Sequence, residues 1–256
     1  MMKFVHRIAG LLAGVAVFPC TALALDLNVV HSGSWPPYAS EDLPEQGLAI
    51  ELVTTALTRA GYTPRVQTAT LTAILEGTGT GVYDVFATPW YTMERSQSLD
   101  FSQPYLESSI QFIKRKDTAF EYSRFDDLEA MKIGVVEGYA YDEDFNDSTA
   151  IEKIAAGSLE ENLHKLIAGE IDLSLDDALV LRYTLHRSLP DRAADLQILA
   201  TPLVTRGVNI GVSRKNPDHA RIVSDFDQAI AEMKQDGTHE AIIRKHKQFI
   251  EHPTGP

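Results

Sequence analysis

Hydrophobic and polar residues follow two patterns along this chain. Short apolar runs of strand length occur at 25–31, 132–137 and 171–175. Between such runs lie longer segments, such as 48–60 and 218–234, in which an apolar residue recurs every third or fourth position. This spacing is typical of a helix that buries one face. Strands that alternate with helices predict an α/β fold.

Two segments are predicted to be loops. Trp35-Pro36-Pro37-Tyr38 contains two prolines, which cannot donate hydrogen bonds to a sheet. The glycine-rich stretch 77–81 follows a helix predicted to start at 71–75 and precedes a strand predicted at 84–88. A phosphate-binding loop has the opposite order, strand and then helix, so that the helix N-terminus faces the anion. We therefore interpret 77–81 as a flexible connection.

The N-terminal segment has the organisation of a secretory signal peptide. Lys3 and Arg7 precede the apolar stretch 8–18, and Ala22-Leu23-Ala24 provides small residues for cleavage, which we place after Ala24. A run of about eleven apolar residues is shorter than the roughly twenty that span a bilayer. Alternatives are a membrane anchor and acylation of Cys20, although the preceding Phe18-Pro19 is a poor acylation context. The prediction is a protein exported to the periplasm.

Composition excludes several kinds of chemistry. Cys20 is the only cysteine, so a mature chain would have no disulfide, thiolate zinc site or cysteine nucleophile. Loss of the leader takes the net charge from -13 to -15, a balance that repels nucleic acid. His239, His246 and His252 lack the spacing and partners of a zinc site and are predicted on helix surfaces. No hydrolase motif occurs, and no metal or cofactor is expected.

Several motifs occur in a characteristic order from Trp35 onward. The most specific is Thr92-Met93-Glu94-Arg95 followed by Leu99-Asp100-Phe101-Ser102-Gln103-Pro104-Tyr105. Further matches are Trp35-Pro36-Pro37-Tyr38, Gly47-Leu48, Gly81-Val82-Tyr83-Asp84, Phe125-Asp126-Asp127-Leu128, Gly169-Glu170-Ile171-Asp172 and Asp236-Gly237-Thr238. With these motifs the chain resembles the amino-acid-binding family of periplasmic solute-binding proteins (family 3).

The resemblance implies a type II periplasmic-binding-protein fold. Each of two lobes would be a mixed sheet flanked by helices, with two crossing strands near 110–114 and 206–212 and a ligand cleft between the lobes. Residues 25–109 and 210–256 would form a discontinuous lobe one. Residues 110–209 would form lobe two, after a signal peptide at 1–24.

The same resemblance implies a function. A monomeric protein would capture a small polar, amino-acid-like ligand and deliver it to an ABC permease in the inner membrane, without turnover. One alternative is an enzyme on this scaffold, similar to dehydratases of cyclic phenylalanine precursors, with Glu137, Asp176 or Asp177 as the general acid. The other is a module that reports ligand binding to a signalling partner.

Charged candidates for the cleft are Arg95 and two adjacent acids. At Arg95 the family has its carboxylate-binding arginine, whose planar fork holds both oxygens; an exposed arginine paired with Glu94 or Asp100 is the alternative. Asp177 matches the acid that receives the ligand amine, and Asp176 could replace it. Because neighbouring side chains on a strand point to opposite faces, only one of the two is expected to face the cleft.

The aromatic candidates are Trp35 and Tyr38, which resemble the family's aromatic wall; ordinary core packing is an alternative for Tyr38. Where the family carries Gly-x-Thr, this chain has Thr88-Pro89-Trp90. Pro89 lacks a backbone donor, and Trp90 replaces the threonine hydroxyl with a large ring. Thr88 offers a hydroxyl two positions earlier in the chain. The standard amino-acid pose is therefore in question.

The segment Gly138-Tyr139-Ala140-Tyr141 follows a predicted strand. We expect it to open a helix, whose free backbone donors would bind a ligand oxygen beside Tyr139. A simple turn is the alternative.

Overall fold

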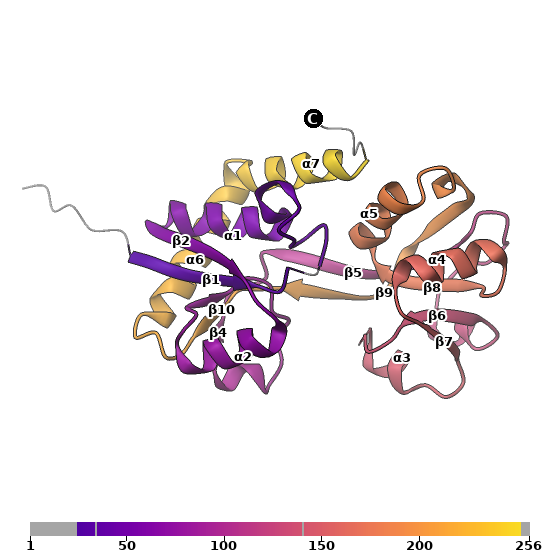
Figure 1. The fold of residues 1–256 in the computed structure, drawn as a ribbon, viewed down its shortest axis with the longest axis horizontal. Coiled ribbons are helices and arrows are strands. Elements are labelled where there is room, and N and C mark those ends of the chain that lie inside the picture. The colour runs from indigo at the N-terminus through magenta and orange to yellow at the C-terminus, as the bar shows by residue number, and fades with distance from the viewer. Residues whose placement is uncertain (1–24, 34, 140, 252–256) are drawn as a thin grey trace, which may run out of the picture.

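The protein consists of two α/β lobes, each built on a five-stranded sheet (Figure 1). The computed structural model describes residues 25–33, 35–139 and 141–251. The predicted leader with its cleavage site, Cys20 and His252 lie outside these residues. We call the part built on the first sheet lobe one and the part built on the second sheet lobe two. Across the described ranges, no helix is both long and apolar enough to span a membrane.

Lobe one contains the first sheet and the helices that cover it. β1 pairs in parallel with β2 and β3, whereas β10 runs antiparallel to β3 and β4. In sheet order the strands are β2 (Tyr62–Thr68), β1 (Leu25–His31), β3 (Val85–Phe86), β10 (Gly211–Ser213) and β4 (Leu99–Phe101). The helices are α1 (Leu48–Arg59), α2 (Leu71–Thr80), α6 (His219–Gln235) and α7 (Thr238–Glu251), with short 3-10 turns at Pro44–Gln46 and Arg95–Gln97.

The core of lobe one follows the predicted apolar spacing. Leu48, Leu52 and Ala56 form the buried face of α1, and Ile222 and Phe226 of α6 lie in the same cluster. The sheet contributes its inward residues to this cluster as well. Burial of apolar side chains contributes about 25 cal/mol per Å², so these faces hold the helices on the sheet.

The glycine-rich stretch 77–81 corrects the prediction of a flexible connection. α2 continues through it to Thr80, and Gly81, with a φ of +86°, ends the helix in the left-handed conformation. Gly77 is buried, and a Cβ at that position would collide with the ring of Tyr83. The glycines therefore serve close packing and helix termination. The strand predicted at 84–88 is shorter in the structure, where β3 comprises only Val85–Phe86.

Lobe two contains the second sheet, ordered β7-β6-β8-β5-β9. β6 is parallel to β7 and β8, and β5 is antiparallel to β8 and β9. The strands are β5 (Leu106–Arg115), β6 (Lys132–Val136), β7 (Glu152–Ala156), β8 (Leu173–Asp177) and β9 (Leu196–Val208). The helices are α3 (Glu143–Asp147), α4 (Leu159–Ala168) and α5 (Ala178–Ser188), with 3-10 turns at Phe125–Leu128 and Ala193–Asp195.

The strands β5 and β9 run side by side between the lobes (Figure 1). Leu106 pairs with Val208, and both pack against the core of lobe one. Residues 110–114 pair with β8 inside lobe two, so the first crossing lies earlier in the chain than predicted. The apolar residues of this segment, Ile110, Phe112 and Ile113, are buried in the second sheet. Lobe boundaries at residues 109 and 210 stay a prediction.

Candidate functional site

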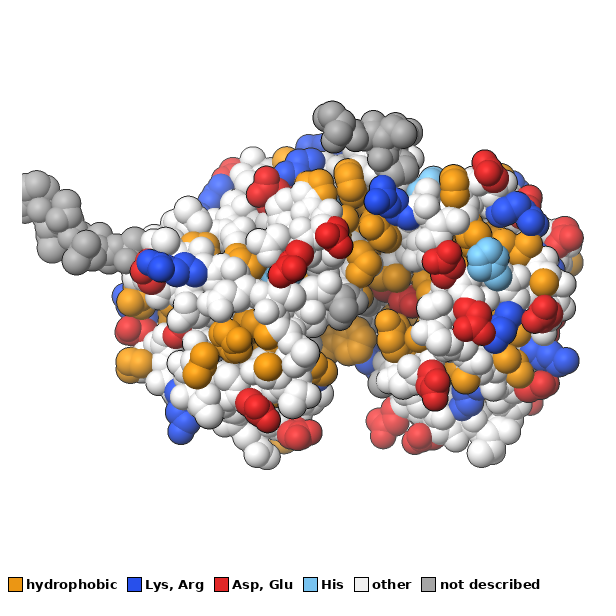
Figure 2. Space-filling view, in the orientation of Figure 1, with side chains coloured by type: hydrophobic (Ala, Val, Ile, Leu, Met, Phe, Trp, Pro, Cys, Tyr) orange, Lys and Arg blue, Asp and Glu red, His pale blue; other side chains and the backbone are white. Residues whose placement is uncertain are grey.

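A cavity of about 340 Å³ lies between the two lobes, on a molecule whose surface is hollowed between them (Figure 2). Lobe one and the loops around it provide half of the lining, and the crossing strand β5 with lobe two provides the other half. The lining residues are Ser32, Trp35, Leu71, Phe86, Thr88, Trp90, Arg95, Ser108, Ile110, Gly138, Tyr139, Tyr141, Asp176 and Asp177. The cavity thus combines aromatic rings with one guanidinium and two carboxyl groups.

Arg95 begins the 3-10 turn before β4 and is half-buried at the cavity wall. Its Nη1 donates to the carbonyl oxygen of Trp90 at 3.1 Å, and its backbone N–H donates to Thr92 Oγ1 at 3.1 Å. Asp100, a predicted alternative partner, instead accepts from Arg214 and contacts His219. Within the described ranges, no carboxylate forms an ion pair with Arg95. Among the described residues, the guanidinium is therefore positioned by a backbone carbonyl rather than by an ion pair.

Asp177 is the last residue of β8 and the N-cap of α5. Its side chain is 2% exposed. Five donors from both sides of the lobe junction bond to it: Tyr38 Oη at 2.9 Å, Ser108 Oγ at 2.9 Å, and the backbone N–H groups of Ser109 at 2.9 Å, Leu179 at 2.8 Å and Val180 at 3.3 Å. A carboxyl group that accepts five hydrogen bonds has little remaining capacity to accept another.

Asp176 differs from its neighbour in its hydrogen bonding. Its Oδ1 accepts from the backbone N–H of Asp177 at 2.7 Å, and no other donor in the described part of the chain bonds to the carboxyl group. The side chain is 6% exposed. Burial raises the pKa of Asp176 to about 7; the bond from the Asp177 N–H opposes this rise, and the charge of Asp177 adds to it.

The two acids correct the expectation that only one faces the cleft, because both line the cavity. Side chains alternate only while the strand continues. Asp177 ends β8, and its φ of -58° and ψ of 139° turn the chain into α5. Its carboxyl group therefore stays near that of Asp176.

The aromatic rings form a connected group at one wall. Trp35 stacks on Tyr38 with centroids 4.1 Å apart, and Trp90 meets Trp35 edge-on at 6.2 Å. Tyr38 belongs to the core of lobe one and is absent from the cavity lining; burial raises the pKa of its hydroxyl well above the usual value. Tyr38 therefore packs in the core, which was the alternative to a place in the aromatic wall. Its hydroxyl donates to Asp177.

Trp90 and Thr88 both line the cavity. The indole occupies space there, and Thr88 offers a hydroxyl. The guanidinium of Arg206, on β9, lies 5.2 Å from the Trp90 ring centroid. The buried Nε1 of Trp90 has no acceptor among the described residues. The indole is therefore held by its edge-on contact with Trp35 and the cation–π contact with Arg206 rather than by a hydrogen bond.

Tyr139 is 56% exposed at the lobe-two edge of the cavity. The predicted helix start at this segment is wrong: α3 begins at Glu143. The Tyr139 N–H donates to the carbonyl of Val136 at 3.2 Å and the Tyr141 N–H to Asn146 Oδ1 at 3.3 Å. Because these donors are used in a turn, they are not available to a ligand.

Some lining residues were absent from the sequence-based set. Tyr141 belongs to the segment Gly138-Tyr139-Ala140-Tyr141, and Phe86 lies inside the strand predicted at 84–88, two residues before Thr88. Ser108 and Leu71 gave no signal, because an isolated serine or a leucine at a helix start is common anywhere. Glu137, named as a possible acid, is exposed and does not line the cavity.

The histidines of α7 also correct a prediction. His239 and His246 are buried, not on the helix surface. His239 Nε2 bonds to the Tyr105 carbonyl at 2.8 Å, and His246 Nε2 contacts Glu51 Oε2 at 2.6 Å. Both tie α7 to lobe one. No potential metal-binding group of His, Cys, Asp or Glu occurs within the described residues.

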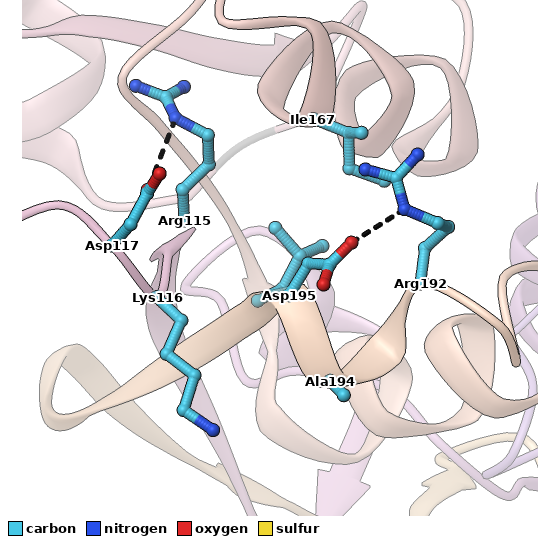
Figure 3. Close-up of a pocket in the computed structure, with 8 residues that line it drawn as sticks. Arg115, Lys116, Asp117, Ile167, Arg192, Ala194 and Asp195 are labelled. Atoms are coloured by element: carbon cyan, nitrogen blue, oxygen red, sulfur yellow. Dashed lines mark hydrogen bonds and ion pairs between the residues drawn. The ribbon is translucent and has the colours of Figure 1, made fainter.

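A second cavity, of about 440 Å³, lies at the end of lobe two where β5 finishes and β9 begins (Figure 3). Its charges largely neutralise one another. Arg115 lies 3.9 Å from Asp117, and Arg192 lies 2.6 Å from Asp195. The cavity between the lobes is the better candidate, because its charged groups lack such compensation.

Comparisons with known proteins assign the family. The chain belongs to the bacterial extracellular solute-binding proteins, family 3, which it matches over residues 27–249. It is similar to ABC transporter arginine-binding protein 1 of Escherichia coli K12, with 28% identity over 152 residues, 59% of this chain and 60% of that protein. It is also similar to the L-cystine-binding protein TcyJ of the same strain, with 29% identity over 59% of this chain and 55% of that protein. The chain thus matches less than two thirds of either relative.

Solved structures agree on the fold. An ancestral cationic amino acid solute-binding protein, AncCDT-1, superposes with a TM-score of 0.69 at 20% identity, covering 86% of this chain and 94% of that one. Another structure of AncCDT-1 is described as a precursor of cyclohexadienyl dehydratase. The two mixed sheets flanked by helices are the type II periplasmic-binding-protein fold predicted from the motifs.

Proposed function

We propose that this protein captures a small amino-acid-like ligand in the periplasm and delivers it to an ABC permease. The observation that carries the proposal is that Arg95 and Asp176 line one cavity from opposite lobes without an ion-pair partner among the described residues. A zwitterion that loses its water needs an opposite charge at each end. Arg95 would hold the ligand carboxylate through its planar fork, and Asp176 would accept the ammonium group.

Further features support the same proposal. Trp35 and Trp90 would pack against the body of the ligand, and Thr88 would add a hydroxyl. The relatives named for arginine and cystine favour an amino acid, and the acidic net charge disfavours nucleic acid. Asp177 acts as a structural group, because its acceptor capacity is used within the protein. We expect a monomer, exported after cleavage behind Ala24.

A ligand screen tests the proposal. Protein unfolded and refolded to remove bound solutes would be heated with single amino acids, polyamines or small organic acids. We expect a rise in Tm with one related group of ligands, since a ligand that binds only the folded state stabilises it, by about 2.7 kcal/mol at a hundredfold excess over Kd. Calorimetry should then give one site per chain. An unchanged Tm with every compound contradicts the proposal.

The variant Arg95→Lys tests the role of the guanidinium. Lysine keeps the charge but loses the two parallel hydrogen bonds, so we expect the Kd of the ligand to rise about tenfold to a hundredfold. Arg214→Lys is the matched control, because Arg214 pairs with Asp100 and does not line the cavity. Equal Kd values for the two variants would remove Arg95 from the binding mechanism.

A second candidate is a dehydratase. Burial gives Asp176 a pKa of about 7, which suits a general acid near neutral pH, and the similarity to AncCDT-1 gives the idea a structural basis. Incubation with prephenate or arogenate, followed by detection of the aromatic product, tests it. Product that forms with the wild type and not with Asp176→Asn would favour this candidate over transport.

A further inference from the structure

We propose that ligand capture by this protein releases a proton from Asp176, so that affinity for an amine-bearing ligand falls as the pH falls. The inference rests on the proposed function, because it assigns Asp176 to the ligand ammonium. It adds a regulatory property of the cleft, one that follows from the unequal environments of the two adjacent acids.

The first step of the argument is the unequal division of hydrogen bonds. Five donors hold Asp177, whereas Asp176 receives only the N–H of Asp177 from the described residues. Two adjacent buried carboxylates repel each other when both are charged. A charge on Asp176 in the ligand-free cleft would therefore lie in a buried site with one donor and next to a second carboxyl group, so this environment favours the protonated form of Asp176.

The second step concerns the surroundings of Asp176. The titratable groups facing it are Asp177 on the same strand, Tyr38 from lobe one, and Tyr139 and Tyr141 from the loop after β6. Gln111 pairs with it on β5. The tyrosines are neutral at pH 7, since burial raises the pKa of each of the three. None of these groups is positively charged. Arg95 also faces the cavity, from the opposite lobe, but no ion pair joins it to Asp176 among the described residues.

The third step is the arrival of the ligand. An ammonium group beside the carboxyl group favours the charged form, since an opposite charge within about 4–6 Å lowers a carboxyl pKa by roughly 1–3 units. Binding therefore expels the proton that the free cleft holds. With a free pKa of about 7, about half a proton leaves per ligand at pH 7, and binding should be about tenfold weaker at pH 6 than at pH 8.

Calorimetry with L-arginine as the probe tests the inference. Titrations at pH 6, 7 and 8, in buffers of different ionisation enthalpy, give both the Kd and the number of protons released. We expect the tenfold change in Kd for the wild type and no pH dependence for Asp176→Asn. The matched control is Asp227→Asn: burial also raises the pKa of Asp227, but this residue lies outside the cavity, so its variant should keep the tenfold change.

The outcomes separate this inference from the proposed function. Binding of L-arginine with equal Kd at pH 6 and 8, or a tenfold change that persists in Asp176→Asn, overturns the inference and leaves the function intact. Failure of every amino acid in the screen to bind overturns both. A ¹³C titration of carboxyl groups in ligand-free protein, assigned with Asp176→Asn, is a separate readout, and a midpoint near 4 for Asp176 overturns the inference alone.

Discussion

The two lobes contribute to the cavity in contrasting ways. Lobe one supplies Trp35, Trp90 and Arg95, which lie on loops and a short turn and are held by ring contacts and one backbone carbonyl. Lobe two supplies Asp176 and Asp177 at the end of a buried strand. Lobe one therefore contributes aromatic rings that shape the cavity, together with a half-buried cation. Lobe two contributes the two acids, in a desolvated environment where electrostatic effects are strong.

Within lobe two, the two adjacent acids also differ from each other. Asp177 joins the lobes, since Tyr38 donates to it from lobe one, while Asp176 is buried beside it with a single identified donor. One carboxylate stabilises the fold, and its neighbour destabilises it when charged. Adjacent, identical side chains thus have opposite expected effects on stability.

The largest effect is expected from Asp177→Ala. The change leaves the Tyr38 and Ser108 hydroxyls and the backbone donors at the start of α5 without their acceptor. Unsatisfied buried polar groups cost about 1–3 kcal/mol each before relaxation, so we expect a loss of about 3–4 kcal/mol in the free energy of unfolding. Urea unfolding monitored by circular dichroism measures it. A loss below about 1 kcal/mol would show that Asp177 does not join the lobes.

Asp176→Asn should have the opposite sign. The native pKa of about 7 lies above the ordinary value of 3.8, so the native state binds more protons than the unfolded state in this interval, and its stability falls as the pH rises through it. Asparagine removes that penalty. We expect the variant to gain about 2 kcal/mol more over the wild type at pH 8 than at pH 5. An equal difference at both pH values would contradict a buried, protonated Asp176.

Much of the fold could be predicted from the sequence because its signals are local. The apolar spacing of α1 and the apolar strand β8 that ends in two acids depend on neighbours in the chain. The motif around Arg95 likewise has a fixed order of residues. Position 77 shows the limit: whether a glycine is flexible or closely packed depends on Tyr83, which contacts it only after folding.

The site could be predicted only in part, for a similar reason. The motifs identified Arg95 and the acid pair as candidates, but the division of roles between Asp176 and Asp177 depends on donors from Tyr38 and Ser108, distant in sequence. The turn at Tyr139 depends on the side chain of Asn146, whose Oδ1 accepts a hydrogen bond from the backbone N–H of Tyr141. Neither the long-range bonds to Asp177 nor the local bond to Asn146 leaves a pattern in a single sequence.

The smallest effect concerns the shape set by lobe one. Trp90 stands where the family resemblance leads us to expect the threonine of Gly-x-Thr, and its indole lines the cavity against Trp35. Trp90→Thr should enlarge the cavity and shift the preference from L-alanine toward L-arginine by about tenfold, equivalent to about 1.4 kcal/mol. Competition calorimetry with the two amino acids measures this ratio. Trp90→Phe keeps a ring and removes the N–H group, so it should change the ratio less. If Trp90→Thr leaves the ratio of the wild type unchanged, the indole does not limit ligand size, and the size limit must come from residues of lobe two such as Tyr139 and Tyr141, which line the opposite wall.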